Sequence, residues 1–537
     1  NAHVILEEAP GTERAPALLP HDIEGAPALR TDVLPFAVSG SSDAALRAQL
    51  RRLRGFAEAN PGLDPLSVAG SLALTRAQLP HRAVVLAPGM EELAERLGAF
   101  ERGEPADGLI RGLARRPARV AFVFPGQGGQ WEGMATALWD ASPPFAAAMQ
   151  ECAAALEPHL DWRLEEVLRG ASGAPSLERI DVVQPALFAV MVSLARLWRS
   201  LGVEPAAVVG HSQGEIAAAH IAGGLSLGDA ARIVVCRSRE LAKIEGGGGM
   251  MAVALSAEQV AARAAHLAER VSVAAANSPA SLVVSGDPAA LDELERDFEA
   301  EGIRSRRIAS TVAGHSPHVE PAREPMLSEL ASISPRAGSL PLYSTVSGEA
   351  AETAAMDAEH WYRNLRQTVR FADAVRAMAG AEIDALIEVG PHPVLISPAL
   401  QTLESLEGGG EVAAIASLRR DEGGPERFLA SLAEAHAAGV AVDWRPLYAG
   451  AERVELPTYA FQRRRYWLAP SSGRSDAAAL GQRDAAHPLL GAMVALADGE
   501  GALWTGRISL AEQPWLADPA ALGTVLLLIA ALAARGR

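Results

Sequence analysis

The chain has 537 residues, a formal net charge of −17 and only two cysteines, Cys152 and Cys236. At about 150 residues per domain, this length predicts three or four folded units rather than a single core. The acidic charge argues against nucleic acid as a partner, and two cysteines provide neither a disulfide framework nor a structural zinc site. The apolar run 525–534 is about half as long as a membrane helix, so we expect a cytoplasmic protein without a membrane partner.

The first long segment, 10–118, reads as a small α/β linker domain. Strand-like pieces alternate with helical ones, and residues 102–116, at the end of the segment, are charged and Gly-rich. The expected strands are 33–39 and 82–87, and the expected helices are 44–59 and 91–99.

A second unit begins near Arg119, where Val120–Phe124 is a short apolar run of the kind found in buried parallel strands. From there to about Leu418, strands alternate with Ala-rich helices, which predicts an α/β fold with a doubly wound parallel sheet. Strands that end at Phe124, Val209 and Ile387 should point at one crevice.

Within this unit, residues 251–310 follow the order strand, helix, strand, strand, helix, strand. This order is typical of a ferredoxin-like split βαβ unit. We therefore expect a ferredoxin-like subdomain inserted into the larger α/β unit.

The most informative segment is Ala206–Glu215, in which an apolar strand meets Gly-His-Ser-Gln-Gly and then a helix-forming run. Gly-x-Ser-x-Gly between a strand and a helix is the pattern of a nucleophile elbow. Gly210 and Gly214 fit because side chains there would collide as the backbone reverses. The turn predicts Ser212 as a nucleophile and the N–H of Gln213 as one donor of an oxyanion hole.

Four motifs and their order along the chain resemble the malonyl-CoA:acyl-carrier-protein acyltransferase family. The resemblance is strongest to the acyltransferase domains of modular type I polyketide synthases. The motifs are Phe124-Pro-Gly-Gln-Gly-Gly-Gln130, Gly210-His-Ser-Gln-Gly214, Gly314-His-Ser-Pro317 and Glu388-Val-Gly-Pro391. The flanking motifs agree with a synthase. The resemblance implies the end of a ketosynthase at 1–9, the linker domain at 10–118, the acyltransferase at 119–418, a post-acyltransferase linker at 419–470 and a dehydratase-like segment at 485–537.

The last segment resembles only the opening of a polyketide dehydratase, through His487-Pro-Leu-Leu-Gly491 and Pro514-Trp-Leu-Ala-Asp518. Pro519 stands where that family has a catalytic histidine, and Leu528 replaces an expected proline. We therefore expect no dehydratase activity from this segment and poor order in 520–537.

The resemblance also implies the rest of the catalytic machinery. A serine at its normal pKa needs a general base, and His315 matches that position in the family. A backbone carbonyl at the position matched by Asn364 would orient the imidazole. The backbone N–H of Gln127, which lies between two glycines, would be the second oxyanion donor.

Arg237 matches the family's arginine that binds the free carboxylate of malonyl-type substrates. A planar guanidinium donates two parallel hydrogen bonds to a carboxylate and stays charged when buried. Gln184, His211 and Asn277 match positions that line the pocket. His211 and Asn277 could equally satisfy local backbone groups.

Substrate choice in the family varies with the four residues that end at the catalytic histidine, here Val312-Ala-Gly-His315. Malonyl selectors typically carry His-Ala-Phe-His and methylmalonyl selectors Tyr-Ala-Ser-His. Gly314 stands in place of the phenylalanine, which leaves room for a branch on the α-carbon. Gln213 and the run 179–185 also resemble methylmalonyl selectors, so we expect methylmalonyl or the larger ethylmalonyl.

The implied reaction passes an acyl group from CoA to Ser212 and then to the phosphopantetheine thiol of an acyl carrier protein. No tightly bound cofactor and no metal is implied, and acyl-CoA is the donor substrate. The expected partners are the carrier protein, the adjacent ketosynthase and other domains of the same synthase.

Two alternatives remain open. A Gly-x-Ser-x-Gly thioesterase or esterase would need an acidic residue and then a histidine after the serine, and it would hydrolyse acyl-CoA. Arg237 and the loop around Gln127 argue against it. A non-catalytic scaffold fragment, in which Arg463-Arg-Arg465 and the linkers dock neighbouring domains, would form no acyl-serine.

Overall fold

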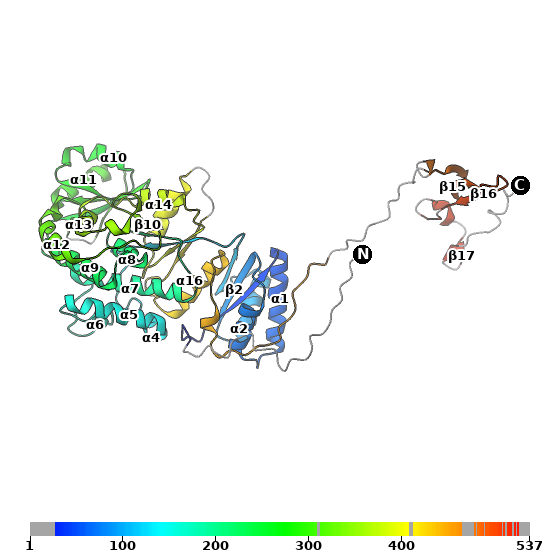
Figure 1. The fold of residues 1–537 in the computed structure, drawn as a ribbon, viewed down its shortest axis with the longest axis horizontal. Coiled ribbons are helices and arrows are strands. Elements are labelled where there is room, and N and C mark those ends of the chain that lie inside the picture. The colour runs from blue at the N-terminus through cyan, green and yellow to red at the C-terminus, as the bar shows by residue number, and fades with distance from the viewer. Residues whose placement is uncertain are drawn as a thin grey trace. The chain divides into compact units, whose positions relative to one another are not determined.

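A computed structural model describes most of the chain (Figure 1). The chain forms two compact units, Asn1–Gln462 and Arg463–Arg537. The described residues are 27–308, 312–406, 412–463, 477–478, 481–487, 489–506, 508–510, 513–517, 520–521 and 524–525.

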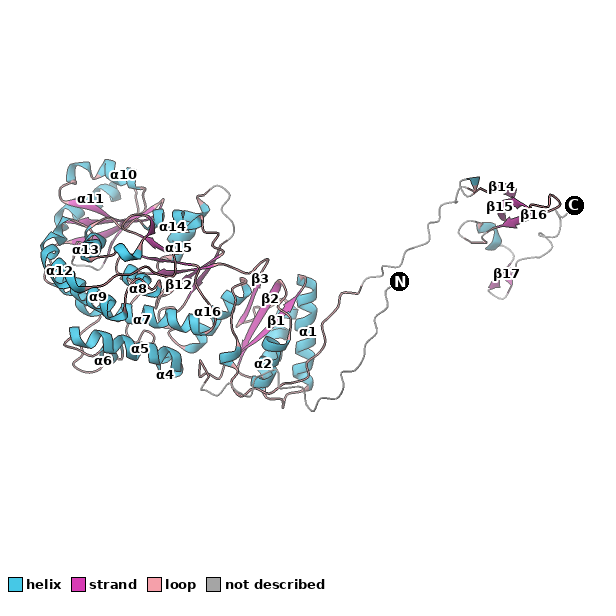
Figure 2. Cartoon of the chain, viewed as in Figure 1, coloured by secondary structure: helices cyan, strands magenta, loops and turns pink. Residues whose placement is uncertain are grey.

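The larger unit opens with an antiparallel three-stranded sheet of order β1-β2-β3, against which three helices pack (Figure 2). In α1 the buried residues Leu46, Leu50 and Leu53 recur at helical spacing, so one face of the helix turns to the sheet. This domain confirms the predicted alternation. Its elements are β1 (Leu34–Gly40), α1 (Asp43–Ala59), α2 (Pro65–Thr75), β2 (His81–Ala87), α3 (Met90–Arg102) and β3 (Leu109–Leu113).

Two elements of this domain were not predicted. The first is β3, within the charged, Gly-rich run 102–116, which pairs with β2 through its backbone although its side chains are only partly buried or exposed. Gly112 is required there, because a Cβ atom at this position would lie 2.5 Å from the carbonyl oxygen of Ala437. The helix α2 is buried along seven consecutive residues, so its sequence lacks the alternation that identifies a half-buried helix.

The central sheet of the larger unit has the order β11-β10-β5-β4-β12-β13. The strands β10, β5, β4, β12 and β13 are parallel, and β11 pairs antiparallel with β10 at one edge. This confirms the predicted doubly wound α/β fold. The strands are β4 (Val120–Phe124), β5 (Ala207–Gly210), β10 (Leu342–Ser344), β11 (Glu349–Ala351), β12 (Ala385–Glu388) and β13 (Ala413–Ala416).

Helices cover both faces of this sheet. Phe122 and Phe124 of β4 join the apolar cluster that contains α5, α7 and α9, whereas Ala121 and Val123 join the one that contains α14 and α15. Alternate residues of β4 therefore pack into two hydrophobic cores, one on each face of the sheet. The helices are α4 (Thr136–Ala141), α5 (Pro143–Leu156), α6 (Leu164–Leu168), α7 (Ile180–Ser200), α8 (Gly214–Ile221), α9 (Leu227–Ala242), α12 (Arg323–Glu329), α13 (Ala358–Arg366), α14 (Phe371–Ala379) and α15 (Ile396–Glu404).

The carboxyl ends of three neighbouring strands lie level at one edge of the sheet. In the register, Phe124 of β4 is opposite Gly210 of β5, and Glu388 of β12 is opposite Val123. The predicted strand ends, Phe124, Val209 and Ile387, are therefore correct to within one residue.

The helix α7 is the one described helix long and apolar enough to cross a membrane. Its most apolar window is 89% buried inside the protein, against α5 and α9 among others, so it is a core helix of the unit. The apolar run singled out in the sequence, 525–534, lies almost entirely outside the described residues.

A four-stranded antiparallel sheet of order β7-β8-β6-β9 forms the predicted ferredoxin-like subdomain. It has its own apolar cluster, which includes Met251, Leu294 and Phe298. A short backbone contact ties it to the central unit, because Ala276 N donates to Val369 O at 2.9 Å. The elements are β6 (Gly249–Val253), α10 (Ala257–Arg263), β7 (Val271–Ser278), β8 (Ser281–Gly286), α11 (Pro288–Ala300) and β9 (Ser305–Ile308).

The segment assigned to the post-acyltransferase linker begins with a core helix, α16 (Pro425–Ala437). This helix contacts β2 and β3 on one side and β13 on another. Its Phe428 is fully buried, with its ring centroid 4.8 Å from that of Trp198 on α7. The helix therefore joins the linker domain to the central sheet.

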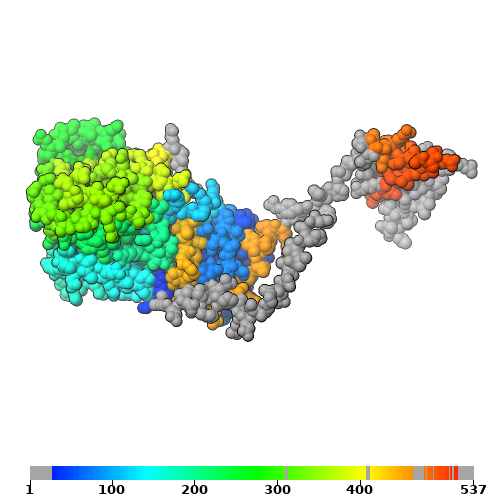
Figure 3. All heavy atoms as spheres, in the orientation of Figure 1, coloured from blue at the N-terminus to red at the C-terminus, as the bar shows by residue number. Residues whose placement is uncertain are grey.

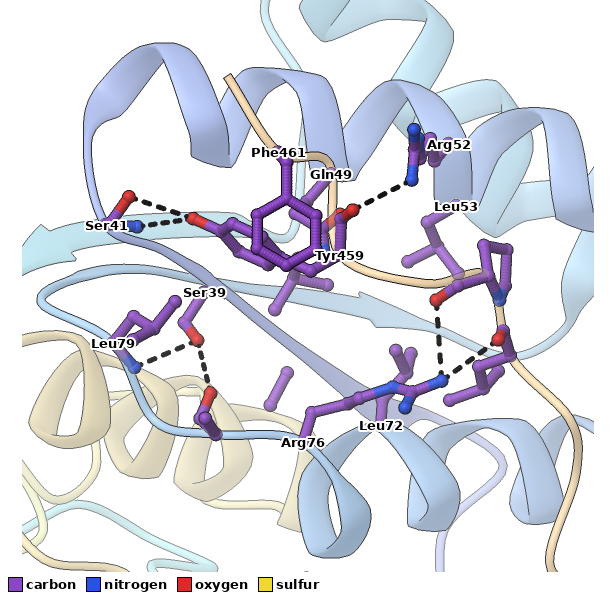
Figure 4. Close-up of a pocket in the computed structure, with 15 residues that line it drawn as sticks. Ser39, Ser41, Gln49, Arg52, Leu53, Leu72, Arg76, Leu79, Tyr459 and Phe461 are labelled. Carbon is purple, nitrogen blue, oxygen red and sulfur yellow. Dashed lines mark hydrogen bonds between the residues drawn. The ribbon is translucent and has the colours of Figure 1, made fainter. Parts of the chain in front are cut away.

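After α16 the chain lies along the linker domain, as the orange and blue surfaces in Figure 3 show. Side chains of the domain bind the backbone of this strap, residues 448–461. Arg52 Nη1 donates to the carbonyl of Thr458 at 2.7 Å, and Arg76 Nη2 donates to that of Leu456 at 3.0 Å. Tyr459 and Phe461 lie over the groove between strap and domain (Figure 4), and Phe461 is 71% exposed.

The smaller unit contains an antiparallel three-stranded meander and a two-stranded pair. The described residues of the dehydratase-like motif, His487 and 489–491, lie where the first two strands meet. Pro519 and Leu528, on which the prediction of a defective dehydratase rests, lie outside the described residues. The strands are β14 (Arg483–His487), β15 (Leu490–Ala495), β16 (Ala502–Thr505), β17 (Ala520–Ala521) and β18 (Thr524–Val525).

The position of α16 makes a stability prediction. Replacing Phe428 by alanine removes a fully buried ring and should lower the free energy of unfolding by about 3–5 kcal/mol. Urea unfolding followed by tryptophan fluorescence measures this loss. The control Gln150→Ala, at an exposed position of α5, should change it by less than about 0.5 kcal/mol. Equal stability of the two variants would show that α16 is a dispensable linker helix.

Candidate active site

The nucleophile elbow forms as predicted between β5 and α8. Ser212 has φ of 55°, a left-handed conformation that non-glycine residues rarely adopt. A Cβ atom at Gly210 would lie 2.3 Å from Glu215 Cα, and one at Gly214 would lie 2.3 Å from the carbonyl oxygen of Phe124. Only glycine fits at either position, which is the steric reason inferred from the sequence.

The structure brings Ser212 and His315 together across 103 positions of sequence. Ser212 Oγ lies 2.8 Å from His315 Nε2. His315 Nδ1 lies 2.8 Å from the carbonyl oxygen of Gln367. A carbonyl only accepts, so Nδ1 carries the hydrogen and Nε2 is free to accept the serine proton.

The predicted role of Asn364 is corrected by this contact. The carbonyl that orients His315 belongs to Gln367, because α13 ends at Arg366 and Gln367 is the first residue with an extended backbone beyond it. Asn364 lies one turn earlier and acts through its side chain. Its Nδ2 donates to the carbonyl oxygen of Ser212 at 3.2 Å.

Burial, together with the positive charge of Arg237, lowers the pKa of the His315 imidazole to about 3. The bond to the Gln367 carbonyl opposes these effects only in part. The imidazole is therefore neutral across the physiological pH range, which is the form that a general base needs.

Arg237 of α9 is 2% exposed and lies directly on the nucleophile. Its Nη2 donates to Ser212 Oγ at 2.8 Å, and its Nη1 donates to Gln184 Oε1 at 3.2 Å. Burial lowers the pKa of the guanidinium to about 10, so it stays charged at neutral pH. Within the described part of the chain no carboxylate forms an ion pair with it, which is unusual for a buried charge.

His211 and Asn277 lie within hydrogen-bond distance of each other. His211 Nε2 lies 2.9 Å from Asn277 Oδ1. One residue belongs to the elbow and the other to β7, so the pair links the ferredoxin-like subdomain to the catalytic turn. Burial lowers the pKa of His211, and its ring packs 5.7 Å from that of Phe371.

The loop that carries Gln127 lies against the elbow. A Cβ atom at Gly126 would lie 3.2 Å from the carbonyl oxygen of His211 and 3.8 Å from Ser212 Cβ. The Gln127 side chain is exposed. The Gln213 side chain is 2% exposed, and neither of its amide atoms has a hydrogen-bond partner among the described residues.

The residues before His315 differ in the space around them. Val312 is 3% exposed and belongs to the large apolar cluster. A Cβ atom at Gly314 would meet no atom within 4 Å. Space is therefore open beside Gly314.

Two buried residues, Glu215 and His360, were missed by the sequence analysis. Glu215, in the first turn of α8, accepts hydrogen bonds from Ser344 Oγ at 2.6 Å and Thr345 N at 2.9 Å. Its Oε1 also lies 3.1 Å from His360 Nε2 on α13. One turn further along the same helix, Asn364 binds the carbonyl of Ser212. The helix α13 therefore braces the elbow at two points.

Comparison with known proteins now decides the family. The family model described as acyl transferase domain matches residues 121–442. The chain belongs to this acyltransferase family. A second model, polyketide synthase dehydratase domain, matches residues 487–534.

Curated relatives place this acyltransferase domain within polyketide synthases. Polyketide synthase GfsB of Streptomyces halstedii is 50% identical over 98% of this chain, and the match covers 10% of that protein. Pikromycin polyketide synthase component PikAII of Streptomyces venezuelae is 50% identical over 98% of this chain and 14% of that protein. The chain therefore spans about a tenth to a seventh of the length of these relatives.

Solved structures agree with the fold. The acyltransferase domain from module 8 of the salinomycin polyketide synthase has 49% identity and a TM-score of 0.76, and it covers 78% of this chain and 99% of that chain. The acyl transferase domain of SpnD in complex with 2-(pent-4-yn-1-yl)malonyl has 31% identity and a TM-score of 0.68. The match covers 77% of this chain and 98% of that chain.

The Glu-Val-Gly-Pro motif of this acyltransferase domain has a structural role. Glu388 is 1% exposed, and its carboxylate accepts from the backbone N–H groups of Val394, Leu395 and Ile396 at 2.7–2.9 Å. The following Pro391 carbonyl accepts from Trp131 Nε1 at 3.1 Å. The motif thus supports the loop that leads from β4 past Gln127.

The low pKa of His315 predicts a flat pH profile for the nucleophile. The rate of Ser212 labelling by a neutral alkyl fluorophosphonate should change by less than about twofold between about pH 5 and pH 7.5, because the base stays unprotonated throughout. Intact-protein mass spectrometry measures the label, with Ser212→Ala as the blank. A fall centred near pH 6.5, the ordinary value for histidine, would contradict the assignment of a buried neutral base.

Proposed function

We propose that this domain transfers an α-carboxyacyl extender unit, methylmalonyl or another branched malonyl, from CoA to the phosphopantetheine thiol of an acyl carrier protein. The observation that carries the proposal is the buried guanidinium of Arg237 on Ser212 Oγ, without a carboxylate partner among the described residues. A substrate carboxylate would supply the missing partner through two parallel hydrogen bonds. A monocarboxylic acyl group would leave the charge unpaired.

In the first half-reaction, Ser212 Oγ attacks the thioester carbonyl carbon while its proton passes to His315 Nε2. The Gln367 carbonyl stabilises the imidazolium that forms, through Nδ1–H. The backbone N–H groups of Gln213 and Gln127 would donate to the oxyanion. Collapse of the intermediate breaks the C–S bond, and the CoA thiolate leaves with the proton from His315.

The second half-reaction reverses these roles. The phosphopantetheine thiol gives its proton to His315 and its sulfur attacks the acyl-serine carbonyl. The C–O bond to Ser212 breaks, and the proton returns to Oγ. The products are the carrier-bound thioester and the free hydroxyl of the enzyme.

The geometry argues against both alternatives. A thioesterase with a Ser-His-acid triad would place a carboxylate on His315 Nδ1, but a backbone carbonyl occupies that position. A scaffold fragment would not require Ser212 Oγ to lie 2.8 Å from His315 Nε2, or a buried Arg237 to donate to the same Oγ. The relatives are polyketide synthases, so we propose a carrier protein and neighbouring synthase domains as partners.

Two observations support a branched extender. The space beside Gly314 is open, where a phenylalanine would close it. The related SpnD domain was solved with a 2-substituted malonyl group.

The described cysteines, Cys152 and Cys236, are buried free thiols, which fits a reducing compartment and supports a cytoplasmic enzyme.

The role of Arg237 is tested by Arg237→Met, with Arg239→Met as the matched control on the exposed side of the same helix. Loss of the guanidinium should lower the rate of Ser212 acylation by methylmalonyl-CoA about 100-fold or more, because the carboxylate enters a buried site without a partner. The control should stay within about twofold of the wild type. Rapid-quench mass spectrometry measures both rates, and a similar loss in both variants would refute a specific carboxylate site.

Extender choice is tested at Gly314. In competition between malonyl-CoA and methylmalonyl-CoA, the wild type should form mainly the branched acyl-serine. Gly314→Phe should lower acylation by methylmalonyl-CoA about tenfold or more relative to malonyl-CoA, since a ring fills the open space. The control Gly314→Ala should keep the branched preference. An unbranched preference in the wild type would overturn the extender assignment while leaving the enzyme class intact.

A further inference from the structure

The hydroxyl of Ser212 is engaged from two sides before any substrate binds. It lies 2.8 Å from His315 Nε2, to which it donates, and it accepts from Arg237 Nη2 at 2.8 Å. The second contact is unusual for a nucleophile. A cationic donor on Oγ draws electron density from the atom that must attack the thioester.

The guanidinium is oriented so that a carboxylate would end this contact. Nε and Nη2 form one edge of the guanidinium, and this edge donates two parallel hydrogen bonds to a carboxylate. In the structure Nε has no partner among the described residues, and Nη2 is on Ser212. The other end, Nη1, is bound to Gln184 on α7. A carboxylate on the Nε–Nη2 edge would compete with Ser212 for Nη2.

We propose that the hydrogen bond from Arg237 Nη2 to Ser212 Oγ restrains the nucleophile, and that the α-carboxylate of the substrate releases it. We call this hydrogen bond the latch. This inference rests on the proposed function, in which the substrate carries that carboxylate. The hydrogen bond from Arg237 to Oγ is stronger while Oγ is a hydroxyl than after Oγ has become an ester oxygen, which is a poorer acceptor. An interaction stronger in the ground state than in the transition state slows the chemical step.

The latch adds a second level of discrimination to binding. An acyl-CoA without an α-carboxylate can enter the pocket, but it leaves Nη2 on Ser212 and is attacked slowly. Compared with an α-carboxyacyl-CoA, it then acylates Ser212 more slowly at saturation and also binds more weakly. A site in which Arg237 only binds the carboxylate would discriminate without slowing Ser212 toward neutral reagents.

The test uses a reagent that carries no carboxylate. Ser212 is labelled at about pH 8, where His315 is neutral, with a neutral alkyl fluorophosphonate. In Arg237→Met and Arg237→Leu the latch is absent, and the labelling rate should rise about tenfold, whereas Arg239→Met should match the wild type. Thermal unfolding accompanies each variant, and removal of an unpaired buried charge should leave the midpoint equal or higher. Labelling at the wild-type rate or slower, in variants that keep their midpoint, would overturn the latch.

A second measurement needs no variant at Arg237. In wild-type enzyme the latch predicts that saturating acetyl-CoA acylates Ser212 at least about tenfold more slowly than saturating methylmalonyl-CoA. Equal rates at saturation would overturn the latch even if the variants failed to fold. The proposed function fails separately, if no α-carboxyacyl-CoA acylates Ser212 at all.

Discussion

An unpaired positive charge buried against a serine hydroxyl is the constraint on which the active site depends. Arg237 comes from α9, Gln184 from α7 and Ser212 from the turn after β5, so three elements must pack closely to hold the guanidinium in place. Burying a charge without a counter-charge costs free energy. A site of this kind fits the anionic group that we propose for the substrate, its α-carboxylate.

The catalytic pair also depends on backbone held in an uncommon conformation. Ser212 and His315 both have positive φ, at 55° and 57°. The segment from α13 to Gln367 contacts both of them: Asn364 binds the carbonyl of Ser212, the Leu365 carbonyl accepts from His315 N at 3.0 Å, and the Gln367 carbonyl orients the imidazole. One short segment therefore positions the nucleophile and the base together, so a shift of α13 would disturb the whole dyad.

Sequence reasoning identified the side chains that we propose do the chemistry and missed the residues that position them. Ser212 was identified from its glycine-flanked turn, and His315 and Arg237 from a family resemblance. Gln367 acts through its carbonyl, which leaves no side-chain signal, so that role was assigned to Asn364 one turn away. Glu215 and His360 lie 145 positions apart and meet only in the fold. The strand β3 was missed because its five residues lie within a charged, Gly-rich run, and its side chains are only partly buried or exposed although its backbone pairs with β2.

The most direct test of the account is a crystal structure of the acyl-enzyme formed from methylmalonyl-CoA. The account predicts an ester to Ser212 Oγ, with the free carboxylate on the Nε–Nη2 edge of Arg237 and Nη1 still bound to Gln184. An acyl group whose carboxylate points to solvent, with Arg237 in its present position, would contradict both the carboxylate site and the assignment of the substrate class.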